Sequence, residues 1–317
     1  MIVDKINAYL SKNNLQFNEY IQREVETLAG WSFKRQFMDN DEYDSAGKIH
    51  MSSIGKCPRQ LAYKYLGFEK QGKEIDGRAR INFFFGDLVE LVVIKLAKLA
   101  GVQLVGTGLD QARLCIPIGD DVEISGYPDG FYIGKEMMTI SIKSMPSFRF
   151  RDFEKGIIGQ EYLDQSYIEM YATKLTKCIF IAICKDNGVF AEQIVKRDDK
   201  RIDQLRKNVN SIIKSTTKNL PERKFQANDK GQYPWQCLYC AYWNHCLNAE
   251  KVLQGKRYVL KEKTGTISKQ QIEEIKYFAD DELDKILNHY NIETLKDLNE
   301  TDFEEAITLL TKIKSGS

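Results

Sequence analysis

Apolar residues recur at helical spacing in two stretches in the middle of the chain. Between residues 82 and 100 they repeat every three to four positions, which predicts a long amphipathic helix stopped by Gly101. The predicted buried side carries Leu88, Val89, Val92, Val93, Leu96 and Leu99, and the opposite side carries Asp87, Lys95 and Lys98. A second helix is expected over residues 159–175.

Strand patterns separate and follow these two helices. They lie at residues 102–106, 111–117, 121–125, 131–133, 138–143, 178–184 and 189–195. Within 138–143, Ile140 and Ile142 point to one face of the sheet, while Ser141 and Lys143 point to the other. The order helix, strands, helix, strand predicts an αβββαβ core, which is an α/β fold with a mixed sheet flanked by helices.

Helical patterns also precede this core. Residues 1–50 form a polar helical segment, and its partial apolar stripe is Leu10, Leu15, Phe17, Tyr20 and Ile21. A further helix is expected within residues 52–68, capped by Ser52 or Ser53 and with Cys57 near its start.

The end of the chain predicts a separate helical module. After a hinge near Thr264 and Gly265, Ser268 is the expected cap of its first helix. Its apolar positions at helical spacing are Ile272, Ile275, Phe278, Leu283, Ile286 and Leu287. The stretch resembles the small C-terminal module of some phage recombination proteins. The predicted domains are an N-terminal helical segment (1–50), the core (51–262) and this module (266–317).

The composition is that of a soluble globular protein. Of the 317 residues, 43% are apolar and 29% are charged. No run reaches the roughly 18 consecutive apolar residues that indicate a membrane-spanning helix. The first residues are amphipathic with an early acid, unlike a secretory signal. We therefore expect a cytoplasmic protein that has no membrane partner.

Charge is unevenly distributed, although the formal net charge is only +1. Residues Lys196–Lys224 carry ten Lys or Arg against four Asp or Glu. This basic segment suits a phosphate backbone, or it is simply a solvated helix face. Residues Gln271–Ser317 carry five Lys or Arg against twelve Asp or Glu. That excess disfavours phosphate and favours docking to a protein, or the module is a helical cap on the core.

Three cysteines in ten residues have the spacing of metal ligands. They follow the pattern Cys237-x2-Cys240-x5-Cys246, which brings two thiolates to one centre and folds the third back onto it. Cys57 is the candidate for the fourth ligand because a helix start favours a thiolate. An iron–sulfur cluster is the first interpretation, and zinc with His245 is the alternative. The remaining cysteines, Cys115, Cys178 and Cys184, are expected to be buried small apolar residues.

The stretch Gly126–Ser144 predicts two strands joined by a turn, GYPDG followed by TISIKS. Asp129 in this turn and Lys143 on the second strand can then meet at one point. A carboxylate beside a lysine suits phosphodiester hydrolysis, because Mg²⁺ or Mn²⁺ is held by hard oxygen ligands while a lysine stabilises developing charge.

These elements together resemble one group of nucleases. The pattern S-x-I-x-x-C-P-R at residues 52–59 and the downstream Cys-x2-Cys-x5-Cys bracket the acid and the strand ending in Lys143. The chain therefore looks like the iron–sulfur RecB-like PD-(D/E)XK nucleases, which include CRISPR-associated exonucleases, the nuclease domain of AddB and phage relatives. The resemblance covers about residues 50–250. It implies a 4Fe–4S cluster that clips the two ends of the core together.

The nuclease motifs match position by position, with two departures. Gly86-x3-Glu90 resembles the first motif, and Gly126-x2-Asp129 resembles the second, so both acids are expected to bind metal. Ser141-Ile142-Lys143 lies at the acid-x-Lys motif, and Gln165 with Tyr167 and Tyr171 resembles the helix motif that contacts DNA. The motif acid is Ser141 here, and the usual aromatic residue four after the glutamine is Glu169.

The resemblance implies a divalent site held by Glu90, Asp129 and the Ile142 carbonyl. Glu169 could supply the charge that Ser141 lacks, since it shares a helix face with Gln165; Glu136 is a weaker candidate, and otherwise the site is crippled.

The resemblance implies a metal-dependent DNA exonuclease that favours single-stranded ends. It would act in recombination, repair or CRISPR adaptation, and a phage is one expected source of such a protein. DNA contacts are expected from Lys200, Arg201, Lys207 and Tyr171, and from Arg149 and Arg151 in a loop over residues 146–156. The alternatives are a degenerate DNA-end-binding protein and a scaffold subunit of a recombination complex.

Overall fold

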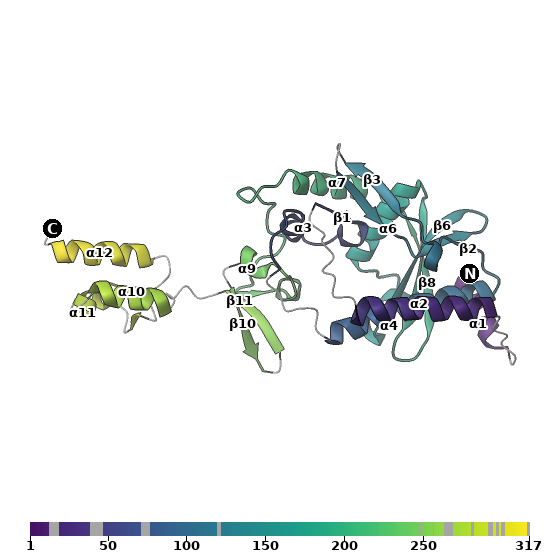
Figure 1. The fold of residues 1–317 in the computed structure, drawn as a ribbon, viewed down its shortest axis with the longest axis horizontal. Coiled ribbons are helices and arrows are strands. Elements are labelled where there is room, and N and C mark those ends of the chain that lie inside the picture. The colour runs from purple at the N-terminus through teal and green to yellow at the C-terminus, as the bar shows by residue number, and fades with distance from the viewer. Residues whose placement is uncertain are drawn as a thin grey trace. The chain divides into compact units, whose positions relative to one another are not determined.

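A computed structural model of the chain describes residues 1–12, 19–38, 47–70, 77–118, 122–247, 249–255, 257–262, 269–279, 282–290, 294–295, 298 and 302–315. The chain forms two compact units, Met1–Lys224 and Phe225–Ser317 (Figure 1). Five sequence-predicted features, Leu15, Phe17, Thr264, Gly265 and Ser268, lie outside the described residues, as does the first residue of the strand expected at 121–125.

The first unit is built on a five-stranded mixed sheet. Its order is β2 (Leu104–Val105), β5 (Gly130–Ile133), β6 (Met137–Met145), β7 (Lys177–Cys184) and β8 (Phe190–Lys196). The central pair β6–β7 is parallel, and the other pairs are antiparallel. The parallel pair requires a crossover, which the helices between β6 and β7 supply.

Helices cover both faces of this sheet (Figure 1). On one face lie α1 (Ile2–Leu10) and α4 (Gly77–Leu99), with α2 (Glu19–Phe37) packed along α4. On the other face lie α5 (Ser147–Glu154) and α6 (Gln160–Thr173). Successive side chains of β6 point to opposite faces of the sheet. Ile140 and Ile142 therefore pack with Val93 and Ile94 of α4 on one face. The predicted α/β class, mixed sheet and helix–strand order are confirmed.

A smaller layer covers the outer side of α6. It consists of α3 (Pro58–Tyr65), α7 (Asp199–Ile213) and the sheet of β1 (Ile49–His50), β4 (Val122–Gly126) and β3 (Leu114–Ile118). Of two short 3-10 turns, η1 (Met51–Ser53) lies between β1 and α3, and η2 (Gly108–Asp110) lies between β2 and β3.

The second unit contains a sheet and a helical module. The sheet is β9 (Gln232–Tyr233), β11 (Arg257–Glu262) and β10 (Ala249–Gln254), accompanied by α8 (Trp235–Leu238) and α9 (Trp243–Cys246). The module is α10 (Lys269–Ala279), α11 (Leu283–Tyr290) and α12 (Phe303–Ser315). Its core includes Ile275, Ala279, Ile286, Leu298, Phe303, Ala306 and Leu310. The tail is therefore helical, as predicted.

Three local predictions are wrong. Neither Ser52 nor Ser53 caps α3, because both lie in η1 and Cys57 is the N-cap, with Pro58 at the first helical position. The stretch expected to be a loop, 146–156, contains α5, since Phe150 and Phe153 are spaced to bury one helix face. Cys115 is exposed rather than buried.

The buried side predicted for α4 is wrong at two positions, although Val89, Val93 and Leu96 pack in the core as expected. Val92 is 47% exposed, while Lys95 is buried and forms an ion pair with Glu24 of α2. The packing of α2 along α4 causes this difference, since the covering helix supplies a carboxylate for the buried lysine.

None of the helices in the part of the chain that the structure describes has the length and apolarity needed to cross a membrane.

Candidate active site

Asp129 is held beside β6, within the central sheet, by a backbone hydrogen bond. It immediately precedes β5, and the pairing of Gly130 with Ile140 brings it beside β6. The Ile142 N–H donates to Asp129 Oδ2 over 2.6 Å. Gly130 has φ +148°, and a side chain there would meet Thr107 at 2.4 Å, so a glycine is required for the strand to approach this closely.

Lys143 faces Asp129 from β6, as predicted. Its Nζ lies 3.9 Å from Asp129 Oδ2 and 5.4 Å from the centre of the Tyr162 ring. Burial lowers the pKa of Lys143, but the nearby Asp129 and Glu169 carboxylates outweigh it and hold the pKa above its ordinary value. Lys143 is therefore a fixed positive charge.

Glu169 is a buried acid on α6 with 1% of its surface exposed. Gln165 Nε2 donates to Glu169 Oε1 over 2.7 Å. Burial and the Asp129 carboxylate raise the pKa of Glu169 to about 8, against the opposing effects of Gln165 and Lys143. When Glu169 is ionised, the positive charge around it is therefore too small to compensate its negative charge.

Glu90 approaches Asp129 from α4 on the other side of the sheet. Gln111 Nε2 donates to Glu90 Oε1 over 3.0 Å. Withdrawal from water and the Asp129 carboxylate raise the pKa of Glu90 to about 8. The negative charge of Asp129 therefore raises the pKa of both glutamates.

Three carboxylates and one ammonium consequently share a single electrostatic neighbourhood. Glu90, Asp129 and Glu169 come from α4, the turn before β5 and α6, and Lys143 interacts with all three. Ser141 is neutral and 4% exposed, pairing with Phe180 in the β6–β7 ladder. The buried acid Glu169 on α6 belongs to the same group of charges.

The donors suit a hard divalent cation in chemistry and in charge, since three carboxylates face one lysine. Among the residues that the structure describes, no three or more His, Cys, Asp or Glu side chains are gathered in a geometry that could hold a metal ion. Glu136, the weaker candidate, forms an ion pair with Lys177 instead.

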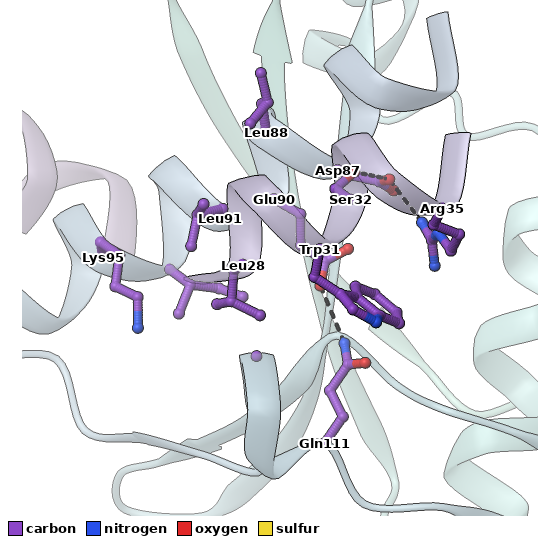
Figure 2. A pocket seen from close by; sticks show the side chains of 12 residues that line it. Leu28, Trp31, Ser32, Arg35, Asp87, Leu88, Glu90, Leu91, Lys95 and Gln111 are labelled. Atoms are coloured by element: carbon purple, nitrogen blue, oxygen red, sulfur yellow. Dashed lines mark hydrogen bonds and ion pairs between the residues drawn. The ribbon is translucent and has the colours of Figure 1, made fainter. Parts of the chain in front are cut away.

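A cavity of about 120 Å³ adjoins Glu90 between α2, α4 and η2. Figure 2 shows Trp31 of α2 beside the hydrogen bond between Glu90 and Gln111. Asp87 on its wall accepts hydrogen bonds from Ser32 over 2.5 Å and from Arg35 over 2.6 Å. The cavity thus connects one acid of the site to the surface of α2.

The residues expected to contact DNA lie on α5, α6 and α7. Arg149 and Arg151 are exposed on α5, and Lys200 and Lys207 are exposed on α7. Their role stays a prediction.

Two further residues of that set already have partners. Arg201 donates to both oxygens of the buried Asp164, over 2.7 and 2.6 Å. Tyr171 lies under Arg206, with 5.2 Å from the guanidinium carbon to the ring centre. Arg201 therefore holds α6 and α7 together, whatever else it contacts.

The predicted cluster ligands are divided between the two units. Cys57 caps α3 in the first unit, while Cys237, Cys240 and Cys246 lie in or between α8 and α9 in the second. All four thiols are partly exposed, whereas Cys178 and Cys184 are buried as predicted.

Two polar neighbours of the site were not predicted from the sequence. Tyr162 precedes Gln165 by three residues, so helical spacing placed it on the same side of α6. Gln111 lies in an irregular stretch, and no periodic signal connects it to Glu90.

Comparisons with known proteins give only distant likenesses. Neither a protein-family model nor a curated protein matches the chain. Among solved structures, SSO0001 is 18% identical with a TM-score of 0.46, covering 70% of this chain and 95% of its own. An alkaline exonuclease, LHK-Exo from Laribacter hongkongensis, is 17% identical with a TM-score of 0.40, covering 53% of this chain and 87% of its own. The same exonuclease in complex with dAMP is 17% identical with a TM-score of 0.39, covering 53% of this chain and 87% of its own. At these identities and TM-scores the likeness assigns no activity to the chain.

Proposed function

We propose that the first unit hydrolyses phosphodiester bonds of DNA with a bound divalent metal ion, as an exonuclease. The observation that supports this proposal is the concentration of acids around Asp129. Two carboxyl groups there, Glu90 and Glu169, have pKa values raised to about 8 beside a single lysine. A cation placed among them would remove that repulsion and take the place of the protons.

Each side chain has a defined task in this proposal. Glu90, Asp129 and Glu169 would hold Mg²⁺ or Mn²⁺, with the Ile142 carbonyl as a further ligand. The bound ion would acidify water and relieve negative charge on the phosphate. Lys143 would orient the attacking water and stabilise charge on the phosphate oxygens. Gln165 is a positioning residue, because it acts through its hydrogen bond to Glu169.

Cleavage of end-labelled DNA, single-stranded and duplex, tests the proposal. Wild-type protein is expected to release nucleotides from ends with Mg²⁺ or Mn²⁺ and not with EDTA. Asp129→Asn should abolish this activity, whereas the control Glu136→Gln should retain it, because Glu136 pairs with Lys177 instead. Equal activity of Asp129→Asn and wild type would refute the proposed site.

A DNA-end-binding protein without cleavage is the second candidate function. It is favoured by the neutral Ser141 beside Lys143, since a crippled site would still attract phosphates. Feeble wild-type cleavage that Ser141→Asp increases would identify this case. Strong wild-type cleavage that Ser141→Ala leaves unchanged would exclude it.

We also propose that Cys57, Cys237, Cys240 and Cys246 bind a 4Fe–4S cluster. The Cys-x2-Cys-x5-Cys spacing of the last three supports this. Protein purified without oxygen is expected to be brown and to contain iron, and Cys240→Ala should lose both. One zinc per chain in colourless protein would assign the cysteines to zinc.

A further inference from the structure

An exposed aromatic surface lies on α2 and the first half of α4, outside the group of charges around Asp129. We define it as Trp31, Phe33, Phe37, Phe83, Phe84 and Phe85. The exposed fractions are 56% for Trp31, 50% for Phe83 and 53% for Phe85. Contiguous exposed apolar side chains of this size mark binding surfaces in soluble proteins.

Three rings of the aromatic surface, Phe33, Phe37 and Phe84, form one connected group across the two helices, and Phe85 adjoins Phe84. Phe84 of α4 lies 5.8 Å from Phe33 and 5.7 Å from Phe37 of α2, measured between ring centres. Phe33 and Phe37 lie 5.0 Å apart. Ring packing across the helix pair holds this part of the surface in place, and a rigid aromatic surface binds flat ligands at little entropic cost.

Positive charge is interleaved with these rings. Residues 31–38 and 77–86 contain four Lys or Arg and no Asp or Glu. Of these, Lys34, Arg35 and Arg78 are exposed. The Arg35 guanidinium lies 4.8 Å from the centre of the Trp31 ring. Alternating aromatic rings and cations suit a polyanion with flat bases, because the cations meet phosphates and the rings stack on bases.

The aromatic surface leads to the candidate active site along α4. Phe83, Asp87 and Glu90 are spaced four and three residues apart, so they share one helix face. Figure 2 shows Asp87 and Glu90 on this helix, with Trp31 and Arg35 opposite them on α2. All four line the same cavity. A strand bound against Trp31 would therefore lie at the cavity that Glu90 lines.

We propose that the aromatic surface binds the unpaired bases of single-stranded DNA and guides the strand past Trp31 to Glu90. Lys34 and Arg78 contact its phosphates, while Arg35 stays paired with Asp87. The direction toward cleavage rests on the proposed function, whereas the binding itself does not. Duplex DNA does not fit this role, since its bases are stacked on one another and are not available to the rings.

Binding without cleavage is the direct test. The full chain in EDTA is titrated against a fluorescent 20-nucleotide oligo(dT), and anisotropy gives the affinity. Phe83→Ala and Trp31→Ala are each expected to weaken binding about tenfold, which corresponds to the loss of one stacked base. Tyr277→Ala is the control, because Tyr277 is an aromatic side chain 82% exposed on the C-terminal module. Affinities equal to wild type in both variants would overturn the proposal.

A second measurement separates this surface from a contact between copies of the chain. Sedimentation of wild type and Phe83→Ala is compared over a range of concentrations without DNA. An unchanged monomer with weaker oligo(dT) binding supports the proposal, whereas a dimer lost in the variant with unchanged binding refutes it. If wild type never cleaves DNA but Phe83→Ala still loses oligo(dT) binding, the surface stands and the proposed function fails. If wild type cleaves DNA and both variants bind oligo(dT) normally, the proposed function stands and the proposed binding by the aromatic surface fails.

Discussion

The two halves of helix α6 each bury an acid, and the surroundings of the two acids are opposite in charge. Asp164 is fully buried and accepts from Arg201 through two nitrogens and from Gln160 over 2.8 Å. Glu169 is equally buried, but its hydrogen-bond donor is the neutral amide of Gln165, and another carboxylate, Asp129, lies nearby. Helical spacing turns the two acids to different sides of α6.

The difference separates a neutralised acid from an uncompensated one. A buried carboxylate that meets a guanidinium on both oxygens is neutralised, and it fixes the packing around it. Gly55 reflects that packing, since a side chain there would lie 2.9 Å from Asp164. A buried carboxylate that faces a second acid is stabilised only when protonated or when a cation arrives. Burial alone did not distinguish the two; the charge of the partner did.

The largest expected effect comes from breaking the structural pair. Arg201→Ala leaves Asp164 buried without its cation, and we expect the free energy of unfolding to fall by about 3 kcal/mol. Urea unfolding measures this loss. Lys200→Ala, on the exposed face of the same helix, should change stability by less than about 0.5 kcal/mol. A small effect of Arg201→Ala would mean that Asp164 is solvated in solution.

If Glu169 acts as proposed, the matching change at this uncompensated acid should spare the fold and remove activity. Glu169→Gln keeps the shape and a hydrogen-bonding group but removes the charge, so we expect at least about a 100-fold loss in the cleavage rate. The free energy of unfolding at pH 8 should stay equal or rise, because a repulsive charge has been removed. Single-turnover rates at saturating Mn²⁺ provide the measurement. A variant that cleaves at the wild-type rate would exclude Glu169 from the site.

The raised pKa values also predict how stability depends on pH. Glu90 and Glu169 titrate at about 8 in the folded protein, against an ordinary value of 4.5. Between these limits the folded chain holds protons that the unfolded chain has released, so stability falls as the pH rises. The slope is at most about 1.4 kcal/mol per pH unit for each carboxyl group.

Glu169→Gln should remove its share of that slope, which urea unfolding from pH 5 to pH 8 without metal would reveal. Mn²⁺ should bind more tightly as the pH rises, because it displaces the same protons. Identical slopes in wild type and Glu169→Gln would contradict the assignment.

The sequence predicted the scaffold of the site better than its electrostatics. The alternation in 138–143 correctly placed Lys143 on the face opposite Ile140 and Ile142, and the turn GYPDG placed Asp129 beside it. Periodicity could not say which of the buried acids of α6 had a cation, because Arg201 lies 37 residues beyond Asp164. For the same reason Lys95 was expected to be exposed, since its partner Glu24 comes from a helix far away in the chain.

The smallest expected effect concerns the basic helix α7. Lys200 and Lys207 are exposed, whereas Arg201 is bound to Asp164, so the two lysines can be replaced without breaking the structural pair. If both contact phosphates, the double variant Lys200→Ala and Lys207→Ala should reduce the salt dependence of oligonucleotide binding. The slope of log K against log salt would fall by about 1.4 for a single strand. Lys276→Ala with Lys285→Ala is the control, because both lysines are exposed on the acidic module. An unchanged slope in the α7 variant would show that DNA does not reach this helix, and the aromatic surface of α2 and α4 would then be the principal contact.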